Sequence, residues 1–362
     1  MPKKISPANI EIELDSILES LHGTNKQRAC LFNLIIYAKC SQRSSYLNKV
    51  TQKIIEKYPC RIILVTYDKN ITKQNLDVNV SVMSAEDGNI AIVCDLIEIF
   101  SGDKDHPKIP FVILPHIIPD LPIYLVHADE PVMGNAVAEK LESLAERIIF
   151  DSESTRCLIT FAKSVIKHSQ KFEGDIADLN WARTEEWRVL FANIFNTKHN
   201  LDDLENAKTI RIFYNEYSNK YFTHTIFQST YFHTWLAVQL NWKIKSITSK
   251  NEIIYTKGKN TIHIEIEGVV NEKVPPGRIV SIEVETAESV VYNFSRQIHK
   301  PTSVVVQKTS PKSCGMPSYF FLEKEDSGQS LVKEIYHFST SSHFMNVLEY
   351  LSTNYSEEAI DE

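Results

Sequence analysis

The sequence predicts an α/β protein of two domains, an N-terminal mixed α/β domain with a mainly parallel sheet and a C-terminal α+β domain with a mainly antiparallel sheet. The chain has 362 residues, more than the roughly 250–300 at which one hydrophobic core usually stops growing. Over about the first 150 residues, short apolar runs alternate with helical patterns, as in parallel sheets covered by helices. After Leu240, runs that alternate polar and apolar residues dominate, as in antiparallel sheets with one wet face.

The first segments of the chain predict a parallel strand-helix-strand unit. Residues Ile10–His22 have the apolar spacing of a helix. A continuous apolar run at Cys30–Tyr37 predicts a strand, and a polar loop follows at Cys40–Ser45. A helix is expected at Tyr46–Tyr58, because Pro59 ends it, and a second apolar strand at Arg61–Tyr67.

The same alternation continues to the expected domain boundary. Strands are expected at Val78–Met83, Ile90–Phe100, Phe111–Leu114, Pro122–Val126 and Arg147–Asp151, and helices at Asn135–Glu146 and Ser154–Lys167. The polar loop His168–Asp175 contains Gly174 and is the candidate linker. We therefore expect domains at residues 1–170 and 171–362.

The C-terminal half predicts a sheet with a few helices. A strand at Thr209–Tyr214 and a helix at Thr230–Leu240 come first, and helices at Leu331–Phe338 and His343–Tyr350 close the chain. The intervening strands are expected at Trp242–Ile247, Glu252–Thr256, Thr261–Glu267, Ile279–Glu285, Val290–Phe294 and Ser303–Gln307. Residues Thr256–Asn260 form an expected hairpin tip.

Composition favours a globular protein of the cytoplasm. Hydrophobic residues make up 43% of the chain, and the formal net charge of −7 disfavours nucleic acid and anionic membranes as main partners. The most apolar window, Ile109–Val126, carries four prolines and is no membrane helix. The N-terminal residues lack a signal-peptide pattern, and the six cysteines are scattered without a C-x-x-C pair. We expect reduced thiols and no internal disulfide.

The chain lacks the motifs of common catalytic and cofactor sites. Of the ten glycines, the closest two, Gly268 and Gly277, are nine residues apart, which excludes the glycine-rich dinucleotide and P-loop motifs. G-x-S-x-G and H-E-x-x-H are also absent. A metal site would need distant histidines such as His106, His116 and His127, whereas lone histidines are usually hydrogen-bonded or surface residues. We expect no enzymatic activity, no cofactor and no metal.

The stretch Asp178–Phe195 is the most distinctive part of the sequence, with two of the four tryptophans and two arginines. Within it, large apolar residues recur at i, i+3, i+4, i+7 and i+8, which places them on one buried stripe of a helix. The members of this stripe are Trp187, Leu190, Phe191, Ile194 and Phe195. Thr184 is the expected N-cap, and the helix is expected to begin near Glu185.

The residues before this helix support two interpretations. Asp178, Trp181 and Arg183 are expected on a non-helical approach, beside Arg188. In one interpretation Trp181 and Trp187 anchor a core while Arg183 pairs with Asp178. In the other, Arg183 and Arg188 are exposed and their guanidinium groups recognise a partner.

The spacing Asp178-Leu-x-Trp181-x-Arg183, followed by Trp187-Arg188, resembles the signature of the glucose-6-phosphate dehydrogenase assembly protein family, OpcA. The chain departs from it at residues 184–186, where Thr-Glu-Glu replaces the leucine, threonine and proline of many relatives. This departure changes the helix cap and leaves both Trp-Arg elements in place.

Four further segments resemble the same family in the same order. They are Arg28–Ile36, Tyr58–Val65, Pro119–Leu125 with its Asp120-Leu-Pro122 run, and Leu144–Ser152. Relatives often carry tryptophans where this chain has Val126 and His127. After about residue 250 the likeness is one of pattern only.

The resemblance implies a non-catalytic cytoplasmic protein that binds glucose-6-phosphate dehydrogenase, promotes its active oligomer and so supports the oxidative pentose phosphate pathway. The motif residues that it implies for partner binding are Asp178, Trp181, Arg183, Trp187, Arg188, Asp120 and Pro122. One alternative is an α/β enzyme acting on a small molecule such as a sugar phosphate, with a site near Arg183 and Arg188. Another is a structural subunit of an unrelated complex.

Overall fold

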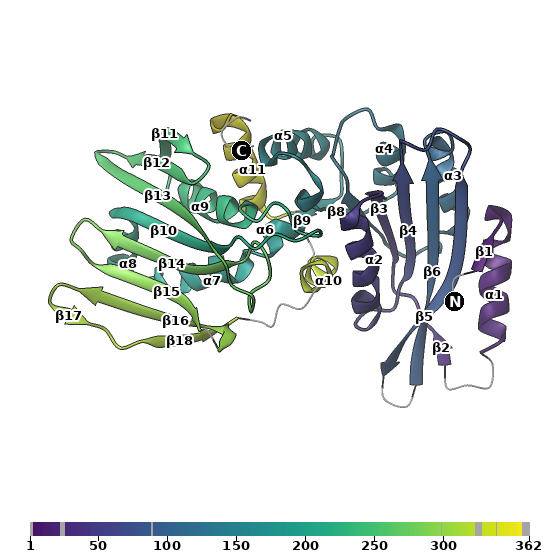
Figure 1. Ribbon diagram of the computed structural model, residues 1–362, viewed down its shortest axis with the longest axis horizontal. Helices are drawn as coiled ribbons and strands as arrows, with labels where there is room; N and C mark the ends of the chain where they lie inside the picture. The colour runs from purple at the N-terminus through teal and green to yellow at the C-terminus, as the bar shows by residue number, and fades with distance from the viewer. Residues whose placement is uncertain are drawn as a thin grey trace. The chain divides into compact units, whose positions relative to one another are not determined.

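The computed structural model describes residues 3–21, 26–87, 90–297, 299–322, 328–337 and 339–356 (Figure 1). The chain folds into two compact units that are interleaved in sequence. The first comprises Met1–Thr155, Lys167–Leu179 and Asp326–Thr340, and the second Arg156–Ile166, Asn180–Glu325 and Ser341–Glu362. The single boundary expected at residue 170 stays a prediction. His22 and Phe338, the expected ends of two helices, lie outside the described residues.

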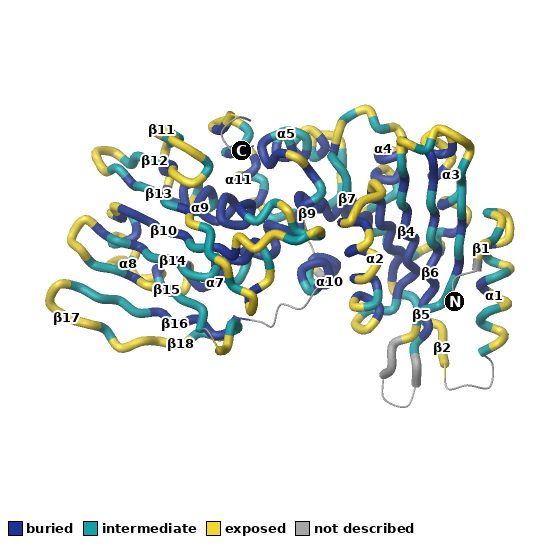
Figure 2. Tube along the Cα trace, viewed as in Figure 1, coloured by how far each residue is buried: buried dark blue, intermediate teal, exposed yellow. Residues whose placement is uncertain are grey.

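The first unit contains a mainly parallel sheet in the strand order β1-β5-β6-β4-β3-β7-β8-β9, with β2 paired to β6. Its strands are β1 Lys3–Ile5, β2 Lys26–Arg28, β3 Asn33–Lys39, β4 Arg61–Asp68, β5 Leu76–Asp87, β6 Ile90–Gly102, β7 Ile123–Ala128, β8 Arg147–Phe150 and β9 Asp175–Asp178. Strands β6, β4, β3, β7, β8 and β9 run parallel, whereas β1 and β5 are antiparallel additions at one edge. The central strands are buried almost throughout (Figure 2), as their continuous apolar runs predict.

Helices pack against this sheet. α2 lies on β3 and β4, α4 lies against β7, and α1 lies against β5. α10 packs beside α2, although the two are far apart in sequence (Figure 1). The bounds are α1 Ile10–Glu19, α2 Gln42–Ile55, α3 Ile109–Ile113, α4 Ala136–Glu142 and α10 Gln329–Tyr336. α5 spans Leu158–Ser169, and short 3-10 turns lie at Pro7–Asn9, His106–Lys108, Leu114–His116 and Ser152–Ser154.

The second unit contains a mainly antiparallel sheet in the order β11-β12-β13-β10-β14-β15-β16-β17, with β18 paired to β16. Its strands are β10 Ala207–Asn215, β11 Lys243–Ser249, β12 Glu252–Lys257, β13 Asn260–Val269, β14 Ile279–Thr286, β15 Val291–Gln297, β16 Lys300–Ser310, β17 Ser313–Cys314 and β18 Ser318–Phe321. The helices are α6 Leu179–Ala182, α7 Glu185–Ile194, α8 Lys198–Glu205, α9 Phe227–Gln239 and α11 Ser342–Asn354. These two sheets confirm the predicted fold class.

The apolar stripe of α7 forms part of the core of the second unit. The Phe191 ring stacks on Phe294 of β15 at a centroid distance of 4.5 Å and meets Phe232 of α9 edge-on at 4.9 Å. Trp187 is 2% exposed. The predicted burial is thus confirmed, with Ile194 half-buried at the end of the stripe.

Some elements differ from the prediction for identifiable reasons. The expected strand Phe111–Leu114 is wrong, because α3 spans Ile109–Ile113 with Pro110 in its first turn. Proline fits that position, since the first N–H groups of a helix have no intrahelical acceptor. The loop expected at Cys40–Ser45 is also wrong from Gln42 onward, because a reciprocal capping box between Ser41 and Ser44 begins α2 early.

The expected non-helical approach to α7 is wrong, because β9 is followed directly by the short helix α6. Asp178 therefore ends a strand, and Trp181 lies on a helix. Among the described residues, none of the helices has the length and apolar composition needed to cross a membrane.

The Trp187→Ala substitution is predicted to destabilise the second unit. Truncation of a fully buried aromatic side chain removes its apolar contacts and leaves a cavity, at a cost of about 3–5 kcal/mol. Denaturant unfolding of the purified variant measures this loss. Val189→Ala is the matched control, since Val189 lies on the same helix and is 52% exposed. Equal unfolding free energies for the two variants would contradict the core role of Trp187.

Candidate functional site

The parallel strands of the first unit have the order of a doubly wound nucleotide-binding sheet. From β3 the chain proceeds outward through β4 and β6 on one side, and through β7, β8 and β9 on the other. Ligands of such sheets bind at the carboxyl ends of the strands where the direction of winding reverses. That place is the gap between the ends of β3 and β7, which makes it the first candidate site.

Aromatic and polar side chains of this chain fill the candidate place. The Tyr37 and Tyr67 rings, from β3 and β4, stack at a centroid distance of 5.3 Å. Tyr37 Oη bonds to His106 Nε2 at 2.9 Å and accepts a bond from Asn135 Nδ2 at 3.1 Å. Tyr67 Oη donates to Asp129. Burial raises the pKa of both tyrosines, so both hydroxyls stay protonated.

The start of α2 does not fit a dinucleotide pyrophosphate. In dinucleotide-binding sheets, glycines at this turn let the backbone approach the phosphates, and the first N–H groups of the helix bind them. Here the turn contains Cys40 and Ser41, and the Ser41 side chain accepts the Ser44 N–H. Arg43 is turned into the protein, where Nε and Nη2 donate to the Asp151 carboxylate at 2.6 and 2.8 Å. The side chains of Ser41 and Arg43 are therefore bonded within the protein, and this turn does not suit the binding of a pyrophosphate.

A buried charge cluster lies next to this place. Glu142 Oε1 bonds to His127 Nδ1 at 2.9 Å, and Glu142 Oε2 bonds to His168 Nδ1 at 3.0 Å. Burial opposes ionisation of the Glu142 carboxyl, but the two histidines outweigh burial and lower its pKa to about 2. Burial also opposes a charged His168, but the Glu142 carboxylate outweighs burial and raises the pKa of His168. The cluster is therefore held by ionic hydrogen bonds.

The histidines considered for a metal do not come together. His116 Nδ1 bonds to Glu11 at 2.8 Å, beside the buried guanidinium of Arg61 at the amino ends of the strands. His106 and His127 both lie beside Tyr37, at the carboxyl ends of the strands. In the part of the chain that the structure describes, no three His, Cys, Asp or Glu side chains are arranged to hold a metal ion. The six cysteines are free thiols.

The Trp-Arg motif forms a packed cluster in the second unit. The Trp181 ring lies 6.0 Å from Tyr231 of α9 and 5.7 Å from Phe344 of α11. The Arg188 guanidinium stacks on the Trp181 ring, 3.5 Å from its centroid, and Nη1 donates to the Trp181 carbonyl at 2.8 Å. Arg188 is half-buried. The Arg188 guanidinium thus covers one face of the buried Trp181 ring.

Thr184 is the N-cap residue of α7, but the side-chain cap expected from it does not form. Its hydroxyl instead donates to the Trp181 carbonyl at 2.8 Å and accepts a bond from Arg188. The reason is the helical turn α6, which brings the Trp181 carbonyl back to Thr184.

Arg183 is a buried residue, so the expectation that its guanidinium is exposed is wrong. It is 6% exposed, Nη1 donates to Asn180 Oδ1 at 2.7 Å, and the guanidinium lies 5.2 Å from the Phe222 ring. Its backbone carbonyl accepts a bond from Arg278 Nη1 at 2.9 Å. Asp178, at the end of β9, accepts bonds from the N–H and hydroxyl of Ser152 at 2.8 and 3.0 Å.

Asp120 and Pro122 lie in a loop that is fixed by Asn33, the first residue of β3. Asn33 Nδ2 donates to the Ile118 carbonyl at 3.0 Å, and Oδ1 accepts the Ile118 N–H at 2.9 Å. The Asn33 N–H donates to the Pro122 carbonyl at 2.8 Å. Asp120 is exposed and has a left-handed backbone with φ of 62°. The motif residues of this segment thus shape a turn.

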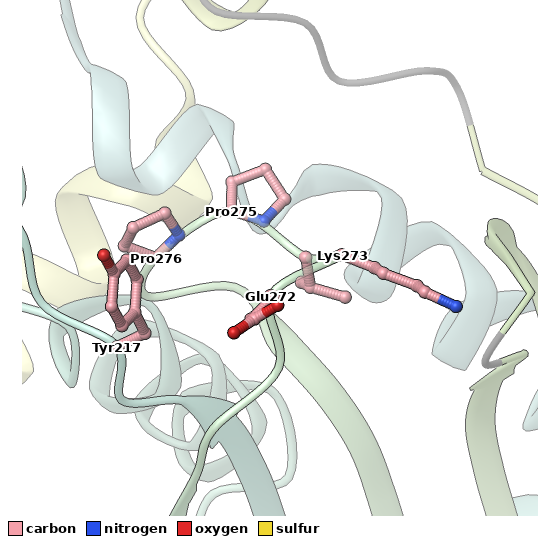
Figure 3. A pocket seen from close by; sticks show the side chains of 6 residues that line it. Tyr217, Glu272, Lys273, Pro275 and Pro276 are labelled. Carbon is pink, nitrogen blue, oxygen red and sulfur yellow. The ribbon is translucent and has the colours of Figure 1, made fainter.

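A surface hollow in the second unit is the second candidate site. It has a volume of about 460 Å³ and is lined by Tyr217, Glu272, Lys273, Val274, Pro275 and Pro276 (Figure 3). These residues are not among those predicted for a site from the sequence. An available signal was the Val-Pro-Pro-Gly turn at residues 274–277, which follows a strand and precedes the buried Arg278.

Two family models match the chain. Residues 51–166 match the model described as the N-terminal domain of a glucose-6-phosphate dehydrogenase subunit, and residues 174–348 match the model for its C-terminal domain. Both are models of the OpcA family. No curated protein sequence matches the chain.

Solved structures of similar fold include oxidoreductases and a transcriptional regulator, Gal80p. KijD10, a 3-ketoreductase from Actinomadura kijaniata in complex with TDP-benzene and NADP, has a TM-score of 0.50 and 8% identity over 89% of this chain and 95% of its own. Levoglucosan dehydrogenase, in complex with NADH and L-sorbose, has a TM-score of 0.44 and 10% identity over 90% of this chain and 96% of its own. At 8% identity, the likeness to KijD10 shows a Rossmann-like α/β fold alone.

The stability of the first unit is predicted to depend on pH through Glu142 and His168. The carboxylate contribution is present above its ordinary pKa of 4.5 and is lost as pH falls toward 2. The imidazolium contribution is present below the ordinary His168 pKa of 6.5 and is lost as pH rises through its raised value. Both contributions are thus present between these two ordinary values.

The Glu142→Gln substitution should remove this pH dependence and lower stability most between pH 4.5 and 6.5. Melting temperatures recorded across pH measure the effect. Glu146→Gln is the control, since Glu146 is exposed and follows the same helix. A profile of Glu142→Gln parallel to that of the wild type would contradict the ionic cluster.

The Arg183→Ala substitution is predicted to destabilise the second unit by about 1–3 kcal/mol, because Asn180 loses a buried donor and the arginine stem loses its packing. Lys208→Ala, at an exposed position of β10, is the control. Denaturant unfolding of both variants measures the difference. Unchanged stability of Arg183→Ala would show that its guanidinium is dispensable to the fold and restore a direct role in recognition.

Proposed function

The chain belongs to the OpcA family, and on this premise we propose that it is a non-catalytic protein that binds glucose-6-phosphate dehydrogenase and promotes its active oligomer. The observation that carries the proposal is the match of both family domains, over residues 51–166 and 174–348. In this proposal the protein acts in the cytoplasm and supports NADPH supply through the oxidative pentose phosphate pathway.

The first unit supports a binding role over a catalytic one. Its sheet has the order of a dinucleotide-binding fold, but the carboxyl ends of β3 and β4 carry stacked tyrosines that bond to His106 and Asp129. The start of α2 is closed by its own serines and by the pairing of Arg43 with Asp151. These contacts suit a rigid scaffold, since buried polar networks with satisfied partners hold one conformation.

The mechanism that we propose is linkage between binding and assembly. A partner that binds only the active oligomer stabilises that oligomer by its own differential binding energy. At a free concentration of 100 times its Kd, such a partner shifts the assembly equilibrium by about 2.7 kcal/mol per site. This shift changes the ratio of oligomer to inactive forms by about a hundredfold, without any chemistry by the binding protein.

The sugar-phosphate enzyme is the rival function, with Arg183 and Arg188 as its expected anion-binding pair. Arg183 is bonded to Asn180 and packed on Phe222, while the Arg188 guanidinium covers Trp181. Both guanidinium groups therefore have structural partners, which favours the binding protein.

The test mixes the purified chain with the dehydrogenase of its own host and follows NADPH formation across a titration. We expect the rate to rise and saturate at a fixed ratio of protein to enzyme, with a matching rise in the dehydrogenase mass measured by light scattering. The chain denatured by heat serves as the control. An unchanged rate and an unchanged oligomeric state would contradict the proposal. Turnover of a sugar phosphate by the chain alone would instead support the sugar-phosphate enzyme.

A further inference from the structure

Two helices begin at the switch point of the first sheet. α2 follows β3, and α4 follows β7, so the starts of both helices lie toward the carboxyl ends of these adjacent strands. In dinucleotide-binding sheets, the N–H groups at such a helix start bind phosphate, and the ligand lies across the crevice beside it. Because this sheet has the strand order of that class, the side chains at the switch point decide whether a dinucleotide fits.

The start of α2 is capped by its own side chains. Ser41 Oγ accepts the Ser44 N–H at 3.3 Å, and Ser44 Oγ accepts the Ser41 N–H at 3.0 Å. Arg43, the cation of this turn, is 6% exposed and donates to the Asp151 carboxylate at 2.6 and 2.8 Å. Donors and a cation that a pyrophosphate would use at this turn are thus engaged within the protein.

The start of α4 is closed in a similar way and is also acidic. Asn135 Oδ1 accepts the Ala138 N–H at 3.3 Å, and the Glu139 carboxylate accepts the Gly134 N–H at 2.8 Å. Asp129, in the loop between β7 and α4, adds a second carboxylate. A phosphate bound at this helix start would lie beside groups of like charge, which disfavours its binding.

Two buried tyrosines occupy the crevice itself. Tyr37 and Tyr67 are 0% and 1% exposed, and their rings stack on each other. Hydrogen bonds hold both rings in place, because Tyr37 Oη bonds to His106 and Asn135, and Tyr67 Oη donates to Asp129. Burial lowers the pKa of His106, so its imidazole is neutral near physiological pH and adds no positive charge. A dinucleotide ring would have to displace this network.

Some residues near the switch point would suit a dinucleotide better. In dinucleotide-binding sheets an acid downstream of the glycine turn binds the ribose, and Asp68 ends β4 in a comparable place. Its Oδ1, however, accepts the Asn70 N–H at 2.9 Å. Lys39 and Lys69 are exposed, and exposed lysines hold an anion only weakly and in a manner that salt screens. These residues do not offset the closed helix starts.

We propose that the switch point of the first unit is closed by the side chains of this chain, so that NAD(H) and NADP(H) do not bind there. The inference goes beyond the proposed function, because an assembly protein without catalytic activity could still sense a dinucleotide. Any dependence of the complex on NADP(H) then arises from the dehydrogenase. The first unit is complete without a cofactor, since the tyrosine network holds the place that a cofactor would take.

The test measures binding of NADP⁺, NADPH, NAD⁺ and NADH to the intact chain by calorimetry and thermal melting, at low and at physiological salt. With about 1 mM dinucleotide we expect no saturable heat and a melting temperature within about 1 °C of the ligand-free value. A dinucleotide with a Kd of about 10 µM would instead raise the melting temperature by roughly 5–10 °C. The host's glucose-6-phosphate dehydrogenase is the positive control, because it forms NADPH.

A second measurement tests the network that closes the crevice. Tyr67→Phe removes the donor to Asp129 and keeps the stacked ring. We expect its melting temperature to fall by about 3 °C or more, to the same extent with and without NADPH. Tyr319→Phe is the matched control, because Tyr319 is 57% exposed, and it should melt as the wild type does.

The possible results separate clearly. Saturable binding of NADPH or NADH that persists at physiological salt would overturn the inference, whereas weak binding that salt abolishes agrees with it, because exposed lysines alone would give such binding. An unchanged melting temperature for Tyr67→Phe would overturn the role of the tyrosine network. These results are independent of the proposed function, since a chain that fails to bind the dehydrogenase can still exclude dinucleotides.

Discussion

The contacts of the Arg61 guanidinium hold together the amino ends of the central strands of the first sheet. Arg61 is 4% exposed, and its donors bond to the Asp95 carboxylate at 2.8 and 2.9 Å, to the Glu11 carboxylate at 2.8 and 3.2 Å, and to the His116 carbonyl at 2.7 Å. A buried charge must satisfy its donors, and loss of one partner costs about 3–5 kcal/mol. β4, β6, α1 and the turn before β7 are therefore held by one side chain.

Other buried arginines meet the same requirement. Arg43 is satisfied by Asp151, Arg147 donates to Glu334, and Arg278 donates to the Arg183 carbonyl. In each case a planar cation with fixed donor directions selects the arrangement of segments that are distant in sequence. Four residues that mark the family in sequence are likewise buried within the fold: Asp178, Trp181, Arg183 and Trp187.

Much of the fold followed from local pattern, whereas the sites depended on long-range contacts. The continuous apolar runs at β3 and β4 and the stripe on α7 were predictable, because period and burial are local properties. The run Phe111–Leu114 was misassigned, since a short apolar segment suits a strand or a helix equally. The role of Asn215 is not predictable from local pattern, because its buried amide donates to carbonyls 56 and 59 residues later in the chain. The exposure expected of Arg183 failed for the same reason, as Asn180 and Phe222 come together only through folding.

The return of α10 to the first unit has a consequence for the order in which the protein is made. Arg147 Nη2 donates at 2.8 Å to the carboxylate of Glu334 in α10, which lies 187 residues further along the chain. The Thr340 N–H likewise donates to Asp175 at 2.8 Å, beside the start of β9. During synthesis on the ribosome, these acceptors and donors emerge only after most of the polypeptide has been made. An N-terminal fragment that ends before α10 would leave the Arg147 cation without this buried counter-charge, so a complete first unit requires a segment that is synthesised late.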